Sequence, residues 1–374
     1  MPPLQSEFVH FVLVLLCLAA VFRFILTYKR SCKHARQWGC QPAQNMMLLK
    51  DPVLGLDFLL ESLFGEGTEH YVKHAHTLLQ KLGSTYVARR LTLTSVYTCD
   101  SQNIKHVLAD DFDSFALPVP RVAALSSVLG WGIFALQGHS WSFTRRTLRP
   151  LLSRDSVGSH FDSFESHFQT LQRRIPRDGS TVDLQPIFFW LAMDIATDFL
   201  TGSSTNMLRA KSVGGKEQQF VEDYIMCSAH TVKRMQAGPL RHFVISSEAR
   251  KARDRVCSYI DHHMDEALSR KSSASTALEK LREVTRDRTA LRDQFLHLLL
   301  ASRDTSASLL SNFFFVLARD PERFAKLRAE VLRVAGTQPP SQDSLKQMEY
   351  LRWCIQECKC FPGAQSSAQA LRTK

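Results

Sequence analysis

The sequence lacks regularly spaced cysteine pairs. A zinc site and a disulfide framework both need such pairs, but the nine cysteines are scattered over 374 residues. They are at positions 17, 32, 40, 99, 227, 257, 354, 358 and 360. His74, His76, His262 and His263 also lack a metal-ligand pattern, and we predict that they lie at the surface or cap helices. We therefore expect reduced thiols in a cytosolic environment and no metal site built from these side chains.

The sequence also lacks a zinc-finger spacing, a helix-turn-helix signature and an internal repeat. Its net charge of +11 does not by itself indicate nucleic acid, because acidic residues are interleaved with the basic ones through 248–293. We predict no nucleic-acid partner. A membrane surface or an acidic protein partner fits this charge better. The apolar fraction of 44% is that of a globular protein, and a chain of this length can bury a large core.

The long apolar run is at the amino terminus. From Phe8 to Phe22 the sequence FVHFVLVLLCLAAVF holds no charged residue. If the Arg23 side chain reaches the membrane surface, the apolar segment 8–28 has 21 residues, close to the about 20 that cross a bilayer. We predict a membrane anchor over 1–28 and a basic linker over 29–50. The basic residues after the anchor place the rest of the chain on the cytosolic side. A cleaved signal peptide is the alternative, but the run has no basic region before it and no small-residue cleavage site after it.

Most of the remaining chain has the apolar spacing of helices. We predict helices over 139–152, 157–175, 184–201, 217–235, 246–269, 289–318 and 321–335, with a last one over 344–357. The stretch TYVARRLTLTSVYTC is rich in β-branched and aromatic residues and is the best strand candidate. Gly83 is expected to end the helix before this strand, and Asp100 or Ser101 to cap the next. The predicted fold class is mainly α with a small β-sheet near the N-terminus.

Four consecutive polar residues, 303–306, interrupt an apolar helical run in ASRDTSA. A threonine hydroxyl inside a helix can bond to the carbonyl four residues earlier, here that of Ala301, and such a bond tends to bend or widen the helix. Asp304 is then a candidate proton relay, and Thr305 a hydrogen-bonding group beside a small molecule. The alternative is that Asp304 or Thr305 caps a second helix after a break.

The second candidate element is GHSWSFTRRTLRPLLSRD. Trp141 and Arg145 are four residues apart and so share one face of a helix. An indole N–H and a guanidinium together make a clamp for a carboxylate. The alternative is that the basic residues of this stretch form a solvated face, namely Arg145, Arg146, Arg149 and Arg154.

Taken together, these stretches resemble the cytochrome P450 family, the haem-thiolate monooxygenases, and within it the fungal microsomal group that hydroxylates n-alkanes and fatty acids. The stretches occur in the family's order. They are GCQP followed by KDPVLGLDFLLE, then FDSFALP, LGWGIFALQGHSWSFTRRTLRP, ASRDTSASLLSNFFFVLARDPE and YLRWCIQE. The resemblance implies an α-rich fold with a small β-sheet region over 51–357.

The resemblance also implies a chemistry. Trp141 and Arg145 would hold a haem propionate, and Asp304 and Thr305 would manage oxygen and its protons. The implied reaction is insertion of an oxygen atom from O₂ into a C–H bond of an apolar substrate, a long-chain alkane or fatty acid. The implied electron donor is an NADPH-dependent cytochrome reductase, and the implied location is the endoplasmic reticulum membrane.

The sequence departs from the family's pattern at two places. Ser302 stands where the family usually has glycine, and its side chain would narrow the oxygen groove. After Glu357, Cys360 stands where the family's arginine would follow, and no Phe-x-x-Gly-x-Arg-x-Cys-x-Gly loop follows. Residues 358–374 are predicted to be a divergent, disordered tail, so Cys358 and Cys360 are not expected to bind iron.

On this basis we expect an incomplete cytochrome P450 fold that does not hydroxylate a substrate as written. Two alternatives remain open. The chain is a non-catalytic, membrane-anchored helical protein that binds a reductase or a partner enzyme through its basic face, or it is a mis-spliced gene product.

Overall fold

The computed structural model describes residues 71–90, 93–209, 215–269 and 276–360, together with scattered positions between 21 and 60. The chain forms two compact units, residues 1–68 with 73–110 and residues 69–72 with 111–374. Most of the predicted anchor, 1–28, lies outside the described residues. No helix in the described part of the chain has the length and hydropathy of a membrane span. Within the predicted linker, 29–50, residues 32–37 are helical.

The first unit contains a β-hairpin between short helices. Helix α3 (Tyr71–Leu82) ends at Gly83, whose φ of +96° favours glycine, as the sequence predicted. Strands β1 (Thr85–Arg90) and β2 (Leu93–Thr98) pair antiparallel, with Val87 opposite Val96. The predicted strand is therefore two strands. Asp100 caps α4 (Ser101–Lys105) through the N–H groups of Gln102 and Asn103, and a π-helical turn, η2 (His106–Asp110), follows.

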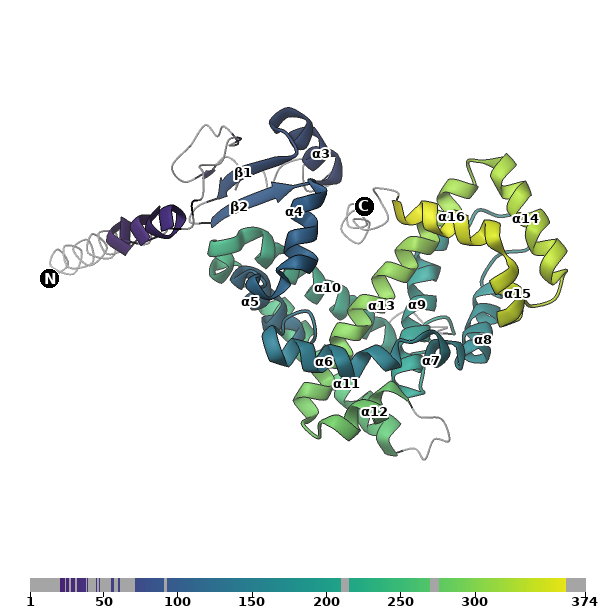
Figure 1. Ribbon diagram of the computed structural model, residues 1–374. Helices are drawn as coiled ribbons and strands as arrows, with labels where there is room; N and C mark the ends of the chain where they lie inside the picture. Colours follow the sequence, from purple (N-terminus) through teal and green to yellow (C-terminus); the bar gives the residue numbers. More distant parts are fainter. Residues whose placement is uncertain are drawn as a thin grey trace, which may run out of the picture. The chain divides into compact units, whose positions relative to one another are not determined.

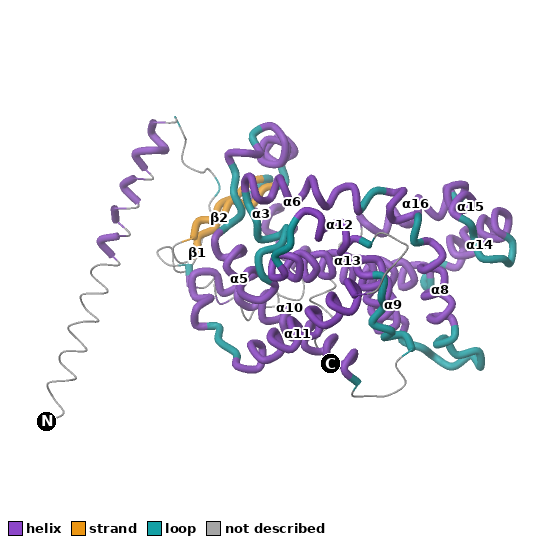
Figure 2. The backbone as a smooth tube through the Cα atoms, turned by 90° about the horizontal axis from the view of Figure 1, so that it is seen from below, coloured by secondary structure: helices purple, strands orange, loops and turns teal. Residues whose placement is uncertain are grey.

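The second unit is helical. Helices α9 and α13 lie side by side near its centre in both views of the chain (Figure 1 and Figure 2). Its elements are η3 (Phe112–Ser114), α5 (Val119–Leu129), α6 (Gly138–Leu151), α7 (Arg154–Gly158), α8 (Phe161–Gln172), α9 (Leu184–Thr201), α10 (Lys216–Ala237), η4 (Gly238–Phe243), α11 (Ser247–Ser269), α12 (Ala277–Val284), α13 (Arg288–Leu317), α14 (Pro321–Ala335), α15 (Gln342–Gln347) and α16 (Glu349–Cys360).

The largest hydrophobic cluster joins α9, α10, α11 and α13. Met193, Tyr224, Ile260 and Leu299 are fully buried in it, each from a different helix. Helix α9 reads LQPIFFWLAMDIATDFLT and is apolar on nearly every side, which is typical of a helix enclosed by others. Among the described residues, the predicted mainly helical fold with a small sheet is therefore present.

The structure corrects several sequence-based boundaries. The predicted helix 157–175 is divided into α7 and α8 at residues 159–160. Helix α12 was missed, although its capping box of Thr276 and Glu279 is visible in the sequence. The predicted last helix is divided at Met348, and its second part, α16, runs on through Cys360.

The predicted tail of 358–374 therefore begins too early, because Cys358 to Cys360 still belong to α16. Cys358 is buried against side chains of α13 and α14, so packing extends the helix. Residues 361–374 lie outside the described residues. The prediction that His263 lies at the surface is also wrong, although its ring does bind at the end of α9, beside Thr201. His263 belongs to α11, and its side chain is buried. Its Nε2 atom lies 2.8 Å from the carbonyl oxygen of Ser203.

Candidate functional site

Helix α13 carries the first pair of predicted site residues. The carboxylate of Asp287 caps its start by accepting hydrogen bonds from the N–H groups of Thr289 and Ala290. From there the helix runs unbroken from Arg288 to Leu317 through the polar residues. The alternative that Asp304 or Thr305 caps a second helix is therefore wrong. Helix α13 packs against α9, and this packing stabilises α13 although the polar residues interrupt its apolar sequence.

The predicted side-chain bond of Thr305 is present. Its hydroxyl donates a hydrogen bond of 2.6 Å to the carbonyl of Ala301. Ser302, which stands where the family usually has glycine, makes the same kind of bond to Leu298, at 3.0 Å. Both hydroxyls thus find partners within the helix, and neither needs a partner from another element. The side chain of Thr305 is exposed, so a ligand can reach it.

Asp304 is held by its neighbour Arg303. The Nη1 atom of Arg303 lies 2.6 Å from Oδ1 of Asp304. Arg303 is buried, and its guanidinium carbon is 4.7 Å from the ring centre of Phe189 on α9 and 5.8 Å from that of Tyr224 on α10. The aromatic faces and the carboxylate together compensate the buried charge. No sequence pattern indicates this cluster, because its members come from three separate helices.

Two polar atoms of this cluster have no partner in the described part of the chain. They are Nε of Arg303 and the hydroxyl of Tyr224, which is fully buried. Burial raises the pKa of Tyr224, so the phenol stays protonated and remains a hydrogen-bond donor. Beside the carboxylate of Asp304 there are thus two unused donors.

Helix α6 carries the second predicted pair. The guanidinium carbon of Arg145 lies 5.4 Å from the ring centre of Trp141, as expected for residues that share a helix face. The ring of Phe112 lies on the same indole, 5.3 Å away between centres. Within the described residues Arg145 has no carboxylate partner and the Trp141 indole N–H has no acceptor. Both donors of the predicted carboxylate clamp are therefore available.

The predicted site residues on α6 and those on α13 are not in direct polar contact among the described residues. In the described ranges, no hydrogen bond or ion pair connects Trp141 or Arg145 with Asp304 or Thr305. Each pair is organised locally, on its own helix.

Sequence reasoning missed a third group, at the start of α13. Three of its side chains bind the loop that leads from α5 to α6. Asp293 accepts the N–H of Trp131 at 2.7 Å, Gln294 accepts that of Ile133 at 3.1 Å, and Nδ1 of His297 accepts that of Phe134 at 3.0 Å. The signal was present in the sequence, because DQFLHLLL places three polar residues in an otherwise apolar run.

The protonation states of this loop cluster follow from burial. The Nε2 atom of His297 lies 3.2 Å from the carbonyl oxygen of Gly130 and donates to it, while Nδ1 accepts, so the ring is neutral. Burial lowers the pKa of His297 to about 4 and raises the pKa of Asp293. Both shifts disfavour the charged form of the side chain.

Glycine is required twice in the loop. Gly130 has a φ of +80°, and a Cβ atom there would lie 2.1 Å from the carboxyl carbon of Asp293. A Cβ atom on Gly132 would lie 2.3 Å from Cγ of His297. The two glycines of the motif LGWGIF therefore allow the loop to approach α13 closely. Because this loop leads into α6, its hydrogen bonds to α13 also fix the start of the helix that carries Trp141.

Comparison with known proteins places the chain in a family. The family model for cytochrome P450 matches residues 52–358. The chain belongs to the cytochrome P450 family. Cytochrome P450 monooxygenase himC of Aspergillus japonicus is 32% identical over 352 residues, which are 90% of this chain and 62% of himC. Cytochrome P450 52A9 of Candida maltosa is 33% identical over 90% of this chain and 69% of its own length. Cytochrome P450 52A1 of Candida tropicalis is 36% identical over 71% of this chain and 53% of its own length.

This P450 chain thus spans about three fifths of the length of himC. The family implies haem, and the chemistry of the donors tests whether it fits. The free indole N–H of Trp141 and the guanidinium of Arg145 suit a haem carboxylate.

Four of the described cysteines do not suit the iron. Burial raises the pKa of Cys227 to about 12 and also raises the pKa values of Cys257, Cys354 and Cys358, which keeps all four as thiols. The donors on α6 therefore suit the edge of a haem, whereas these four thiols do not suit its iron.

Proposed function

We propose that this protein takes part in inserting one oxygen atom from O₂ into a terminal C–H bond of a long-chain alkane or fatty acid. The observation behind the proposal is the group at the middle of α13, where Asp304 is held by buried Arg303 and is followed by the exposed hydroxyl of Thr305. Haem, when bound, supplies the activation of O₂. The remaining roles belong to this chain.

Trp141 and Arg145 orient a haem carboxylate by donating from the indole N–H and the guanidinium. Asp304 takes up and releases protons, because its carboxylate is only partly buried and is fixed toward Arg303. Thr305 accepts a hydrogen bond at the same place, because its own hydroxyl proton is donated to the carbonyl of Ala301. The electrons come from an NADPH-dependent cytochrome reductase. The protein sits at the endoplasmic reticulum membrane through residues 1–28, with the rest of the chain in the cytosol.

We further propose that these 374 residues do not turn over a substrate by themselves. They contain no Phe-x-x-Gly-x-Arg-x-Cys-x-Gly sequence, and a haem thiolate needs a rigid loop around its sulfur.

The test separates haem uptake from iron ligation. Haem is titrated into the purified chain and followed by absorbance, and the reduced protein is then exposed to carbon monoxide. We expect uptake that weakens about tenfold in Arg145→Gln, because one charge-assisted bond is lost, and no thiolate-type Soret band. Arg146→Gln, one residue further on the same helix and also exposed, is the matched control and should bind haem as the wild type does.

Two results would contradict the proposal. Equal weakening in both variants would mean that Arg145 acts only through the net charge of α6. A thiolate-type band, or hydroxylation of a fatty acid, would mean that a cysteine within these residues ligates the iron.

A further inference from the structure

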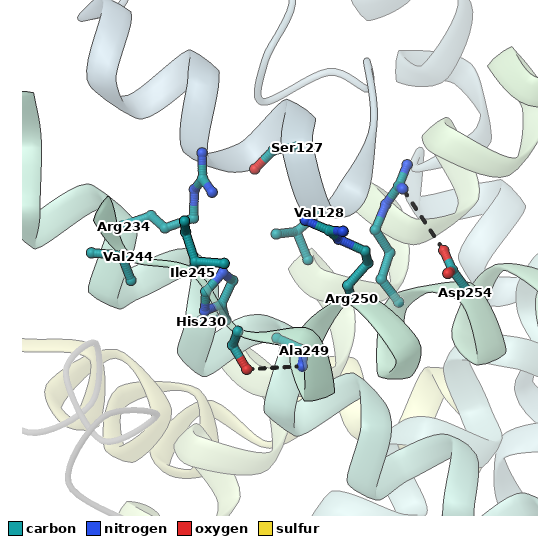
Figure 3. A pocket seen from close by; sticks show the side chains of 11 residues that line it. Ser127, Val128, His230, Arg234, Val244, Ile245, Ala249, Arg250 and Asp254 are labelled. Atoms are coloured by element: carbon teal, nitrogen blue, oxygen red, sulfur yellow. Dashed lines mark hydrogen bonds and ion pairs between the residues drawn. The ribbon is translucent and has the colours of Figure 1, made fainter. Parts of the chain in front are cut away.

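A cleft of about 330 Å³ lies away from the residues discussed above, between α5, α10 and the start of α11. Figure 3 shows Ser127 and Val128 of α5 on one side and the side chains of His230, Arg234 and Arg250 facing them. No residue that lines it belongs to α6 or α13. The cleft is therefore separate from the candidate haem site.

The polar lining of the cleft is strongly basic. Arg234 comes from α10 and Arg250 and Arg253 from α11, and the one carboxylate among the lining residues is Asp254. The only ion pair between these groups that the structure describes is long, 4.0 Å from Arg253 to Asp254. Arg253 thus has one weak partner in this cleft, and no ion pair is described for Arg234 or Arg250. Like charges held together in this way repel one another unless an anion lies between them.

Two of these arginines also have an unsatisfied buried atom. The Nε atoms of Arg234 and Arg253 are shielded from solvent and have no hydrogen-bond partner among the described residues. Buried donors without partners are rare, and each costs free energy until an acceptor reaches it. Burial, followed by the charges of Arg234 and Lys233, lowers the pKa of His230, so the fourth basic group of the cleft is neutral at neutral pH. A neutral imidazole has both a donor and an acceptor to offer.

The rest of the lining is apolar. Val128, Val244, Ile245 and Ala249 form this part of the wall. Ile245 is 74% exposed, and the adjoining Phe243 is 81% exposed. An anion without an apolar part would leave this wall in contact with water. A ligand with an aliphatic chain would cover it.

We propose that the cleft binds an anionic amphiphile, a carboxylate or phosphate on an aliphatic chain. The anion lies among Arg234, Arg250 and Arg253, and the chain lies along Val244 and Ile245. This site does not depend on the proposed function, because its binding needs no haem and no turnover.

The test is calorimetric titration of the full chain, without haem, with octanoate and with octyl phosphate. Octan-1-ol and inorganic phosphate, which each retain half of the ligand's chemistry, are titrated in parallel. We expect octanoate, octyl phosphate or both to bind at least about tenfold more tightly than octan-1-ol and inorganic phosphate, because the anion and the chain each contribute.

Neighbouring residues of α11 give a matched pair of variants. Arg250 lines the cleft, whereas Lys251 does not, and both are exposed, so neither substitution disturbs the core. Arg250→Gln should weaken binding about tenfold and Lys251→Gln less than twofold, although both remove one positive charge. Asp254→Asn removes the only carboxylate of the lining and should tighten binding about threefold.

Three outcomes would overturn the proposal. Equal losses in Arg250→Gln and Lys251→Gln would mean that only the net charge attracts the ligand. Octan-1-ol binding as tightly as octanoate would exclude recognition of the anion. Inorganic phosphate binding as tightly as octyl phosphate would exclude a role for the apolar wall.

Discussion

Asp293 and Asp304 stand on the same helix, α13, in opposite surroundings. Asp293 is buried and accepts the backbone N–H of Trp131, which it holds in place. Asp304 is only partly buried, pairs with a side chain, and is followed by exposed Thr305 and Ser306. Asp293, which binds the loop backbone and also lies 3.9 Å from Nε of Arg292, serves the fold. Asp304 has a single side-chain partner and solvent access, so it remains available for the proton transfer that we propose.

The strongest test of this comparison is at Gly130, which faces Asp293. Gly130→Ala combines a positive φ with a clash against the Asp293 carboxylate, and we expect a loss of about 3 kcal/mol in the free energy of unfolding. Gly179→Ala is the control. Its φ of +81° is nearly the same, but nothing lies within 4 Å of the added Cβ, so strain alone should cost about 1 kcal/mol. Urea denaturation measures both. Equal losses of unfolding free energy in the two variants would mean that the Asp293 side chain moves aside without cost.

The next test uses pH. The pKa of His297 is about 4 in the folded chain and about 6.5 when unfolded. Only the unfolded state gains a proton between these values, so stability is lost as the pH falls from about 6.5 to about 4, by roughly 3 kcal/mol in all. The raised pKa of Asp293 acts in the opposite sense at the acid end, because its folded state binds a proton more readily. Unfolding should therefore be compared between pH 7 and 5.

His297→Gln is the variant that isolates this effect. It removes the titrating ring, so the stability should become nearly independent of pH over that range. An unchanged slope would assign the pH dependence to other groups.

A smaller effect is expected in the middle of the helix. Arg303→Met leaves the carboxylate of Asp304 without its cation, and since that side chain is still 18% exposed, we expect a loss of about 2 kcal/mol, less than for a fully buried pair. The double variant Arg303→Met, Asp304→Leu should recover most of it. If Arg303→Met costs the same with and without Asp304, the pair contributes nothing.

The smallest effect is expected at Thr305. Thr305→Val keeps the shape of the side chain and removes only an exposed hydroxyl that bonds within its own helix, so unfolding should change by less than about 0.5 kcal/mol. A loss above about 1 kcal/mol in urea denaturation would mean that Thr305, like Asp293, serves the fold.

Local signals in the sequence predicted much of this fold. Helices α9 and α14 have their predicted bounds, because apolar spacing coincides with caps at Asp183 and Asp320. The Trp141–Arg145 contact and the Thr305 bond to Ala301 were also predicted, since both follow from helical spacing alone.

What could not be predicted depends on contacts between distant segments. Arg303 lies against Phe189 and Tyr224, which come from other helices, and no sequence spacing connects them. His297 and Phe134 are similarly far apart in the chain. A polar residue in an apolar run indicates that some partner exists, but only the tertiary fold determines which one.

Because Cys358 is buried, its reactivity can report when α16 separates locally from the helices around it. Its thiol packs among Phe313, Leu317 and Leu327, and its raised pKa makes it a poor nucleophile even when a reagent is present. Alkylation at this position must wait until α16 lifts from α13 and α14. A thiol reagent should therefore label Cys358 more slowly than exposed Cys99. The ratio of the two labelling rates reports how often α16 separates from α13 and α14, without any added dye or substitution.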